Sequence, residues 1–164
     1  MKKFLSALLA ALLLLSATAC AAHEPVLPPS RWGEGEAQGM LPHTYSQSEA
    51  YDAAEVVALV TVGDWLEEEL ITGRTFFRTT VQKVYKGDIP HEFVLAQEGC
   101  STWTYRNYPV FTYGNQLLLF LIKYDVSMYR DTYDLVEYPD AYELINTYST
   151  VMYVTRDDSG MSYV

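Results

Sequence analysis

Residues 117–122 are apolar at every position and lie in the middle of the chain. A helix that crosses a bilayer needs about 20 apolar residues, so this run is too short to span a membrane. A short apolar run that follows turn residues, here Gly114 and Asn115, is typical of a strand buried on both faces. The run therefore predicts a central strand in a β-rich domain.

Other segments predict more strands, because they are rich in β-branched residues or alternate between apolar and polar side chains. These segments are residues 56–62, 75–85, 93–97, 132–138, 150–155 and 161–164. The alternation within the second segment changes phase at Lys83 and Val84. A phase change inside a strand predicts a β-bulge, which lets the strand bend around a barrel. We expect residues 138–148 to hold one helical turn or an irregular loop.

A capping box, Ser46 to Glu49, predicts a short helix just before the first strand. The acidic run at residues 67–69 is expected to be a solvated connection and not a metal site. Five to seven short strands and one short N-terminal helix indicate a mainly β fold. We expect a small closed or half-closed β-barrel, because closure removes exposed strand edges. A β-sandwich is the alternative.

The N-terminus predicts where the protein is located. Lys2 and Lys3 precede an apolar stretch at residues 4–19, which is typical of a signal peptide and too short for a transmembrane anchor. Its end, Ser-Ala-Thr-Ala followed by Cys20, resembles a bacterial lipobox. In such proteins the cysteine receives a diacylglycerol and palmitate-type acyl chains and becomes the mature N-terminus. Several chains suffice for stable anchoring. The alternative is a secreted protein cut near Ala22.

This interpretation divides the chain into three parts. Residues 1–19 are the lipoprotein signal peptide, residues 20–45 a lipidated flexible tether rich in Pro and Gly, and residues 46–164 a single domain. A flexible tether of about 25 residues spans roughly 25–30 Å. Loss of Lys2 and Lys3 leaves 9 basic and 21 acidic residues, a net charge of −12. We therefore expect a lipid-anchored domain on the outer side of the cell membrane that stands away from the anionic lipid.

The strings that carry a family resemblance are those at residues 54–60, 84–87, 95–99 and 113–121. Together they resemble an uncharacterised family of secreted bacterial lipoprotein domains of the Firmicutes type, across roughly residues 48–160. Those domains are similar to OB-fold barrels of the kind found in tissue inhibitors of metalloproteinases and netrin modules. The resemblance implies an OB-like β-barrel for residues 46–164.

The resemblance implies no active residue. Metalloproteinase inhibitors of that fold bind the enzyme's zinc with a free N-terminal cysteine, whereas Cys20 would be acylated and separated from the barrel. The disulfides of that fold are also missing, because Cys20 and Cys100 are the two cysteines of the chain. We expect Cys100 to be a buried, inert thiol.

The sequence predicts no catalytic residue, metal site or cofactor. His23, His43 and His91 show no metal-ligand spacing, and no nucleophile or phosphate-binding motif is present. A net charge of −10 argues against nucleic acid as a partner. We therefore favour a non-enzymatic binding module over an enzyme. The alternative is a hydrolase that acts on envelope material through a site assembled from distant residues.

Aromatic residues supply the candidate contacts. The chain has 14 tyrosines, and Trp103, Tyr105 and Tyr108 lie close together in the connection at residues 100–115. A tyrosine offers a flat apolar face and a polar tip, which suits contact with a peptide or a sugar. These three residues are the predicted ligand contacts, with an envelope protein or glycan as the partner. The alternative is that such tyrosines pack against the outside of the barrel.

Overall fold

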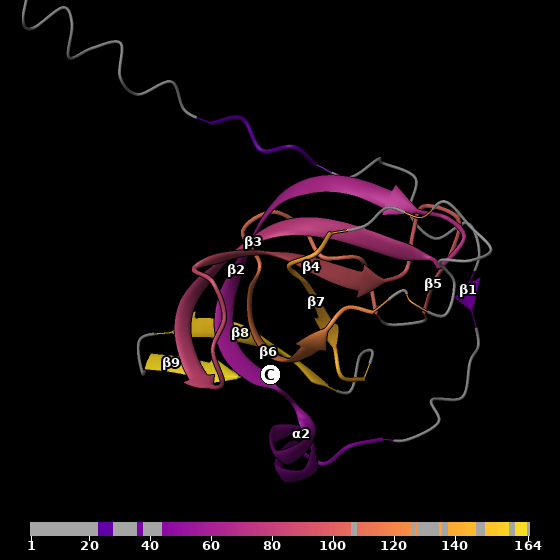
Figure 1. Ribbon diagram of the computed structural model, residues 1–164. Helices are drawn as coiled ribbons and strands as arrows, with labels where there is room; N and C mark the ends of the chain where they lie inside the picture. The colour runs from indigo at the N-terminus through magenta and orange to yellow at the C-terminus, as the bar shows by residue number, and fades with distance from the viewer. Residues whose placement is uncertain are drawn as a thin grey trace, which may run out of the picture.

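The computed structural model describes residues 23–27, 36–37, 44–105, 108–125, 127, 135, 138–146, 150–157 and 160–163. Its elements are β1 (Glu36–Ala37), α2 (Gln47–Ala53), β2 (Val56–Glu69), β3 (Arg74–Lys86), β4 (Glu92–Glu98), β5 (Thr104–Tyr105), β6 (Gln116–Lys123), β7 (Ala141–Leu144), β8 (Val151–Asp157) and β9 (Gly160–Tyr163). The fold is mainly β with one short helix, as the sequence predicted (Figure 1).

Five strands close into a barrel. Around the ring the order is β2, β3, β4, β7 and β6, and β6 pairs with β2 again. The β4–β7 pair is parallel, and the other pairs of the ring are antiparallel. The barrel is OB-like, which confirms the expected fold class over the sandwich. The β8–β9 hairpin extends from the part of the β6 edge that β7 leaves uncovered.

Bulges allow β2 and β3 to curve around the ring. Val57 and Ala58 pair with Lys86 and Val84, so Tyr85 is an extra residue on β3. The predicted bulge near Lys83 and Val84 is therefore confirmed. Further register shifts occur in β2 after Val62, and they bend the long strand so that it can pair with β3 along one edge and β6 along the other.

The two faces of β6 are buried against different partners. Leu117, Leu119 and Leu121 point into the barrel core, whereas Phe120 packs with Ala50 of α2 and its neighbours in a second cluster. The prediction of a strand buried on both faces is confirmed. The helix forms where the capping box predicted it, since the Ser46 side chain accepts from the Glu49 amide and the Glu49 carboxylate accepts from the Ser46 amide.

Two segments differ from the sequence prediction. β7 forms where a helical turn or loop was expected, and it is held by pairing with both β4 and β6. β2 continues through the acidic run at residues 67–69, which was expected to be a solvated connection. Most of the expected strand at 132–138 lies outside the described residues.

The expected tether also needs correction. Residues 23–27 bond to β2, and β1 pairs in parallel with β5, so these parts of residues 20–45 contact the domain. Backbone bonds of this kind leave no pattern in the sequence, which is why the segment was expected to be free. Cys20 and the leader lie outside the described residues. Within the described part of the chain, no helix is long and apolar enough to cross a bilayer.

Candidate ligand-binding site

Trp103 lies directly on the hairpin that joins β2 to β3. It closes a tight turn with Cys100, in which the Cys100 amide donates to the Trp103 carbonyl at 2.9 Å. The indole ring covers Gly73, where an added Cβ would come within 2.3 Å of the Trp103 ring. Gly73 also has a φ of +64°, a left-handed conformation that favours glycine. The hairpin and the indole therefore fit together only because residue 73 has no side chain.

The connection that carries Trp103 is fastened to the hairpin at several points. The Glu68 carboxylate accepts from the Ser101 amide at 2.7 Å and from the Ser101 hydroxyl at 2.6 Å. The Gly99 amide donates to the Gly73 carbonyl at 2.8 Å, and the Thr75 hydroxyl donates to the Gly99 carbonyl at 2.7 Å. The position of Trp103 is therefore set by the barrel rather than by a free loop.

Tyr105 completes an aromatic pair with Trp103. The two rings meet edge to face, with centroids 5.4 Å apart and an interplanar angle of 89°. Both side chains are partly exposed. Tyr105 belongs to β5, whose backbone pairs with β1. We call Trp103 and Tyr105, with the hairpin beneath them, the aromatic corner.

Tyr108, the third predicted contact, has a different role. It is 4% exposed and its ring packs edge to face on Phe111, with centroids 5.8 Å apart. Burial raises the pKa of Tyr108 well above its usual value, and a hydrogen bond with Gln97 acts in the opposite direction. The structure therefore places Tyr108 in the core, under the aromatic corner. The apolar residues Val110 and Phe111 that follow it are the sequence signal that could have indicated burial.

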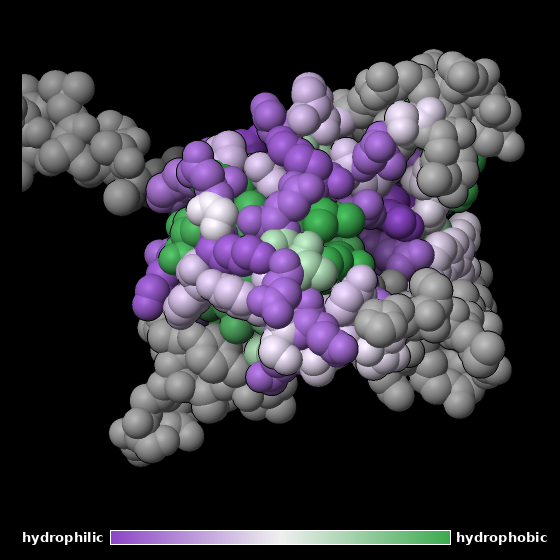
Figure 2. All heavy atoms as spheres, turned by 60° about the horizontal axis from the view of Figure 1, so that its bottom comes forward, coloured by the Kyte–Doolittle hydropathy of each residue, from purple (hydrophilic) through white to green (hydrophobic). Residues whose placement is uncertain are grey.

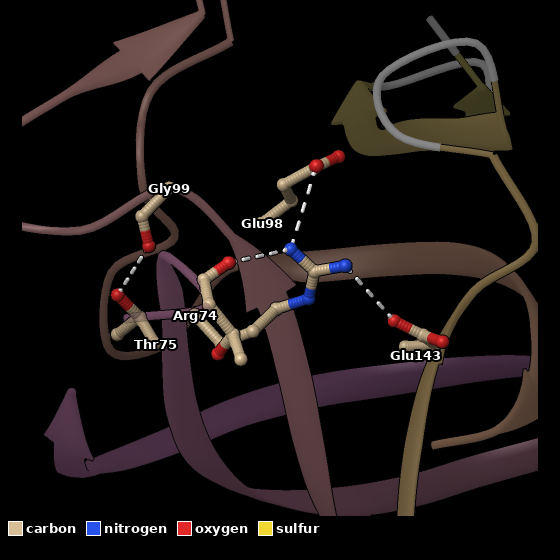
Figure 3. Close-up of polar contacts among 6 residues, drawn as sticks. Arg74, Thr75, Glu98, Gly99 and Glu143 are labelled. Atoms are coloured by element: carbon tan, nitrogen blue, oxygen red, sulfur yellow. Dashed lines mark hydrogen bonds and ion pairs between the residues drawn. The ribbon is translucent and has the colours of Figure 1, made fainter. Parts of the chain in front are cut away.

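A charged cluster lies on the sheet next to the hairpin (Figure 3). Arg74 Nη1 is 3.4 Å from Glu98 Oε1 and donates to the Thr72 carbonyl at 3.2 Å, while Nη2 is 3.4 Å from Glu143 Oε2. Burial raises the pKa of Glu143, and Arg74 counteracts that rise. Sequence reasoning missed this cluster because strand pairing alone brings Arg74 opposite Glu98 and β7 beside β4.

The cluster holds both carboxylates in ion pairs with one guanidinium. His91, the one histidine expected in the barrel domain, precedes β4, whereas Glu98 ends that strand, so the two lie at opposite ends of β4. Among the described residues, no group of three or more His, Cys, Asp or Glu side chains could hold a metal ion. Cys100 is fully buried, as expected, and its sulfur is 3.1 Å from the Thr102 hydroxyl. The described residues thus contain an aromatic pair fixed on the hairpin and a pair of carboxylates bound to Arg74.

No protein-family model, curated protein or solved structure matches the chain. The function must therefore be argued from the barrel and its surface.

Proposed function

We propose that the protein is a lipid-anchored, non-enzymatic binding module on the outer side of the cell membrane, and that its aromatic corner binds an envelope glycan. The lipobox that ends at Cys20 supports the anchor and the location. The excess of acidic residues, 21 against 11 basic ones, supports a ligand other than nucleic acid.

The observation that carries the proposal is the rigid attachment of the Trp103–Tyr105 pair beside the β2–β3 hairpin. β2 and β3 are the first and second strands of the barrel ring. OB-type barrels bind oligosaccharides and oligonucleotides over their second and third strands and over the loop between the first and second strands. In this barrel that loop is the β2–β3 hairpin. A fixed aromatic pair gives a sugar ring a flat apolar face without the entropic cost of ordering a loop.

A second candidate is a hydrolase that acts on envelope material. The observation that favours it is the pair Glu98 and Glu143, one of them with a raised pKa, as a general acid requires. Against it, Arg74 bonds to both carboxylates. If this candidate is correct, Glu143→Gln abolishes release of soluble fragments from peptidoglycan while binding persists.

The binding proposal is tested by cosedimentation with purified peptidoglycan. Replacing Trp103 and Tyr105 together by Ala should weaken binding about tenfold or more, which is about 1.4 kcal/mol or more. The matched control replaces Tyr51 and Tyr85, which are 41% and 40% exposed at another part of the surface. Equal loss in both double variants, or no loss in the first, contradicts the proposal. A photo-crosslinker at Tyr105 that captures an envelope protein instead would show a protein ligand.

The anchor has its own test. Mass spectrometry of protein extracted from membranes should find an acylated N-terminal Cys20, and Cys20→Ala should release the protein from the membrane fraction. A soluble product that begins at residue 21 or later would overturn the anchor.

A further inference from the structure

The chain returns to the barrel immediately after the predicted lipid attachment. His23 Nε2 lies 2.8 Å from both carboxylate oxygens of Asp64 on β2. The Val26 amide donates to Asp64 Oδ1 at 3.0 Å, and the Trp65 amide donates to the Val26 carbonyl at 2.9 Å. Residues 23–27 are thus fastened along the middle of β2.

This contact limits how far the barrel can lie from the lipid. His23 follows Cys20 by three residues, and three residues of extended chain span at most about 11 Å. The Pro- and Gly-rich stretch that was expected to separate barrel and membrane comes after this contact, between residues 23–27 and α2. An acyl group on Cys20 would therefore hold this face of the barrel close to the bilayer.

The same face carries exposed apolar side chains. Val26 is 48% exposed, Leu27 59% and Tyr113 45%. Tyr113 lies in the turn beside this segment, since the Gly114 amide donates to the Val62 carbonyl at 2.8 Å and the Tyr113 ring centroid is 6.5 Å from that of His23. We call His23, Val26, Leu27 and Tyr113 the anchor face.

Charge favours the same orientation. Residues 99–124, which include the Tyr113 turn, contain no Asp or Glu, although the chain has 21 acidic residues. Of the two carboxylates in this region, Asp64 is paired with His23, whereas Glu24 is exposed between His23 and Val26. The end of the molecule that bears α2 lies opposite residues 23–27 (Figure 1), and the view with that end turned forward is largely hydrophilic, with small hydrophobic areas between polar atoms (Figure 2).

We propose that the anchor face rests on the lipid bilayer, with Val26, Leu27 and Tyr113 in the headgroup region, so that the barrel is held in one orientation. The inference rests on the proposed acylation of Cys20. Apolar side chains and a tyrosine are the residues that favour the membrane interface. The expectation that the acidic domain stands away from the membrane is replaced by close apposition through one face, at which Glu24 is the exposed carboxylate of residues 23–27.

The experiment uses the full acylated protein in vesicles of phosphatidylethanolamine and phosphatidylglycerol. An environment-sensitive fluorophore is attached to Leu27→Cys, and the matched control is Leu70→Cys at the tip of the β2–β3 hairpin, where Leu70 is 54% exposed. Cys100 is buried and Cys20 is acylated, so neither competes for the label. We expect a blue-shifted emission, quenched by brominated acyl chains, at residue 27 and a water-like emission at residue 70.

Each outcome decides between defined alternatives. Water-like emission at both positions, in protein that floats with the vesicles, overturns the orientation and leaves the lipid anchor standing. Lipid-like emission at residue 70 alone places the membrane at the hairpin and also overturns it. Protein that does not float, and that lacks an acyl group by mass spectrometry, overturns the anchor and the orientation together. Asp64→Asn removes the ion pair to His23 but not the bond from the Trp65 amide to the Val26 carbonyl, so the residue 27 label should lose part of its blue shift.

Discussion

Two carboxylates on β2, Asp64 and Glu68, hold segments from elsewhere in the chain against the same strand. Asp64 accepts from the Val26 amide and contacts the His23 imidazole, and Glu68 accepts from the amide and hydroxyl of Ser101. Both use a strand side chain to satisfy backbone donors that lie outside the sheet. The same device thus fixes the anchor face at one point of β2 and the aromatic corner at another.

The two attachments differ in strength. The Asp64 attachment ends in an imidazole whose side chain is 61% exposed, and exposed ion pairs contribute little to stability. The Glu68 attachment is part-buried, has a neutral partner, and is reinforced by Gly73, Thr75 and the Trp103 ring. The comparison teaches that the aromatic corner is held rigidly on the barrel, whereas the anchor face is held by weaker contacts.

The largest expected effect comes from Gly73→Ala. The new Cβ would come within 2.3 Å of the Trp103 ring at a φ of +64°, so the indole must move. We expect a loss of about 2 kcal/mol in the free energy of unfolding and a changed tryptophan emission. The control is Gly114→Ala, whose φ is +85° with no atom within 4 Å of the added Cβ, so it adds only backbone strain of about 1 kcal/mol. Equal effects in chemical denaturation would show that Trp103 is not fixed by the hairpin.

Glu68→Ala should have the next largest effect. It leaves the Ser101 amide without its acceptor in a part-buried place, where water can partly replace the carboxylate, so the cost should be about 1 kcal/mol. The near-ultraviolet circular dichroism of the Trp103–Tyr105 pair should weaken as well. Glu92→Ala, a control at an exposed glutamate that begins β4, should leave both measurements close to those of the unchanged protein. A spectrum unaltered by Glu68→Ala would remove the basis for a rigid aromatic corner.

A smaller effect on stability is expected when acid pH protonates Asp64. The hydrogen bond to His23 lowers the pKa of Asp64, and the Val26 amide adds to the shift. Because the folded pKa is depressed, the contribution to stability is complete at neutral pH and is lost as the pH falls through the lowered pKa. Hydrogen exchange at the Val26 amide should therefore speed up at acid pH in the unchanged protein. In Asp64→Asn it should follow only the intrinsic pH dependence.

The smallest effect concerns Glu67, a third carboxylate of β2, which accepts a hydrogen bond from the Tyr138 hydroxyl. Burial, together with Glu67, raises the pKa of Tyr138 to about 12. A raised folded pKa means that the contribution to stability is complete below the ordinary tyrosine pKa and is lost as the pH rises toward 12. Tyr138→Phe should remove a step near pH 12 from the tyrosinate absorbance titration. An unchanged titration would contradict the Glu67 contact.

The parts of the fold that depend on local pattern could be predicted from the sequence. The capping box of α2, the bulge near Lys83 and the doubly buried β6 each follow from residues close together in the chain. β7 could not be predicted, because Ala-Tyr-Glu-Leu has no strand pattern of its own and becomes a strand by filling the gap between β4 and β6.

The site was predicted in part for the same reason. The sequence shows Trp103, Tyr105 and Tyr108 close together in the chain. Which of them faces solvent depends on the packing of the core, in which Tyr108 is buried. Arg74, Glu98 and Glu143 are brought together by strand pairing across 69 residues of chain, so no spacing in the sequence indicates them. The docking of His23 on Asp64 across 41 residues was hidden in the same way.

The β4–β7 seam has a consequence for how the barrel opens. It joins three residue pairs in parallel, whereas β2 and β3 share a ladder along most of their length. Three residue pairs offset little of the entropy of closing the loop between β4 and β7, so this seam should form late during folding. Local opening in the native state should begin at the same place. The amides of β7, which pairs with β4 and with β6 at three positions each, should then exchange with solvent well before those of β2. The ring would open at β7 while the long β2–β3 pairing persists.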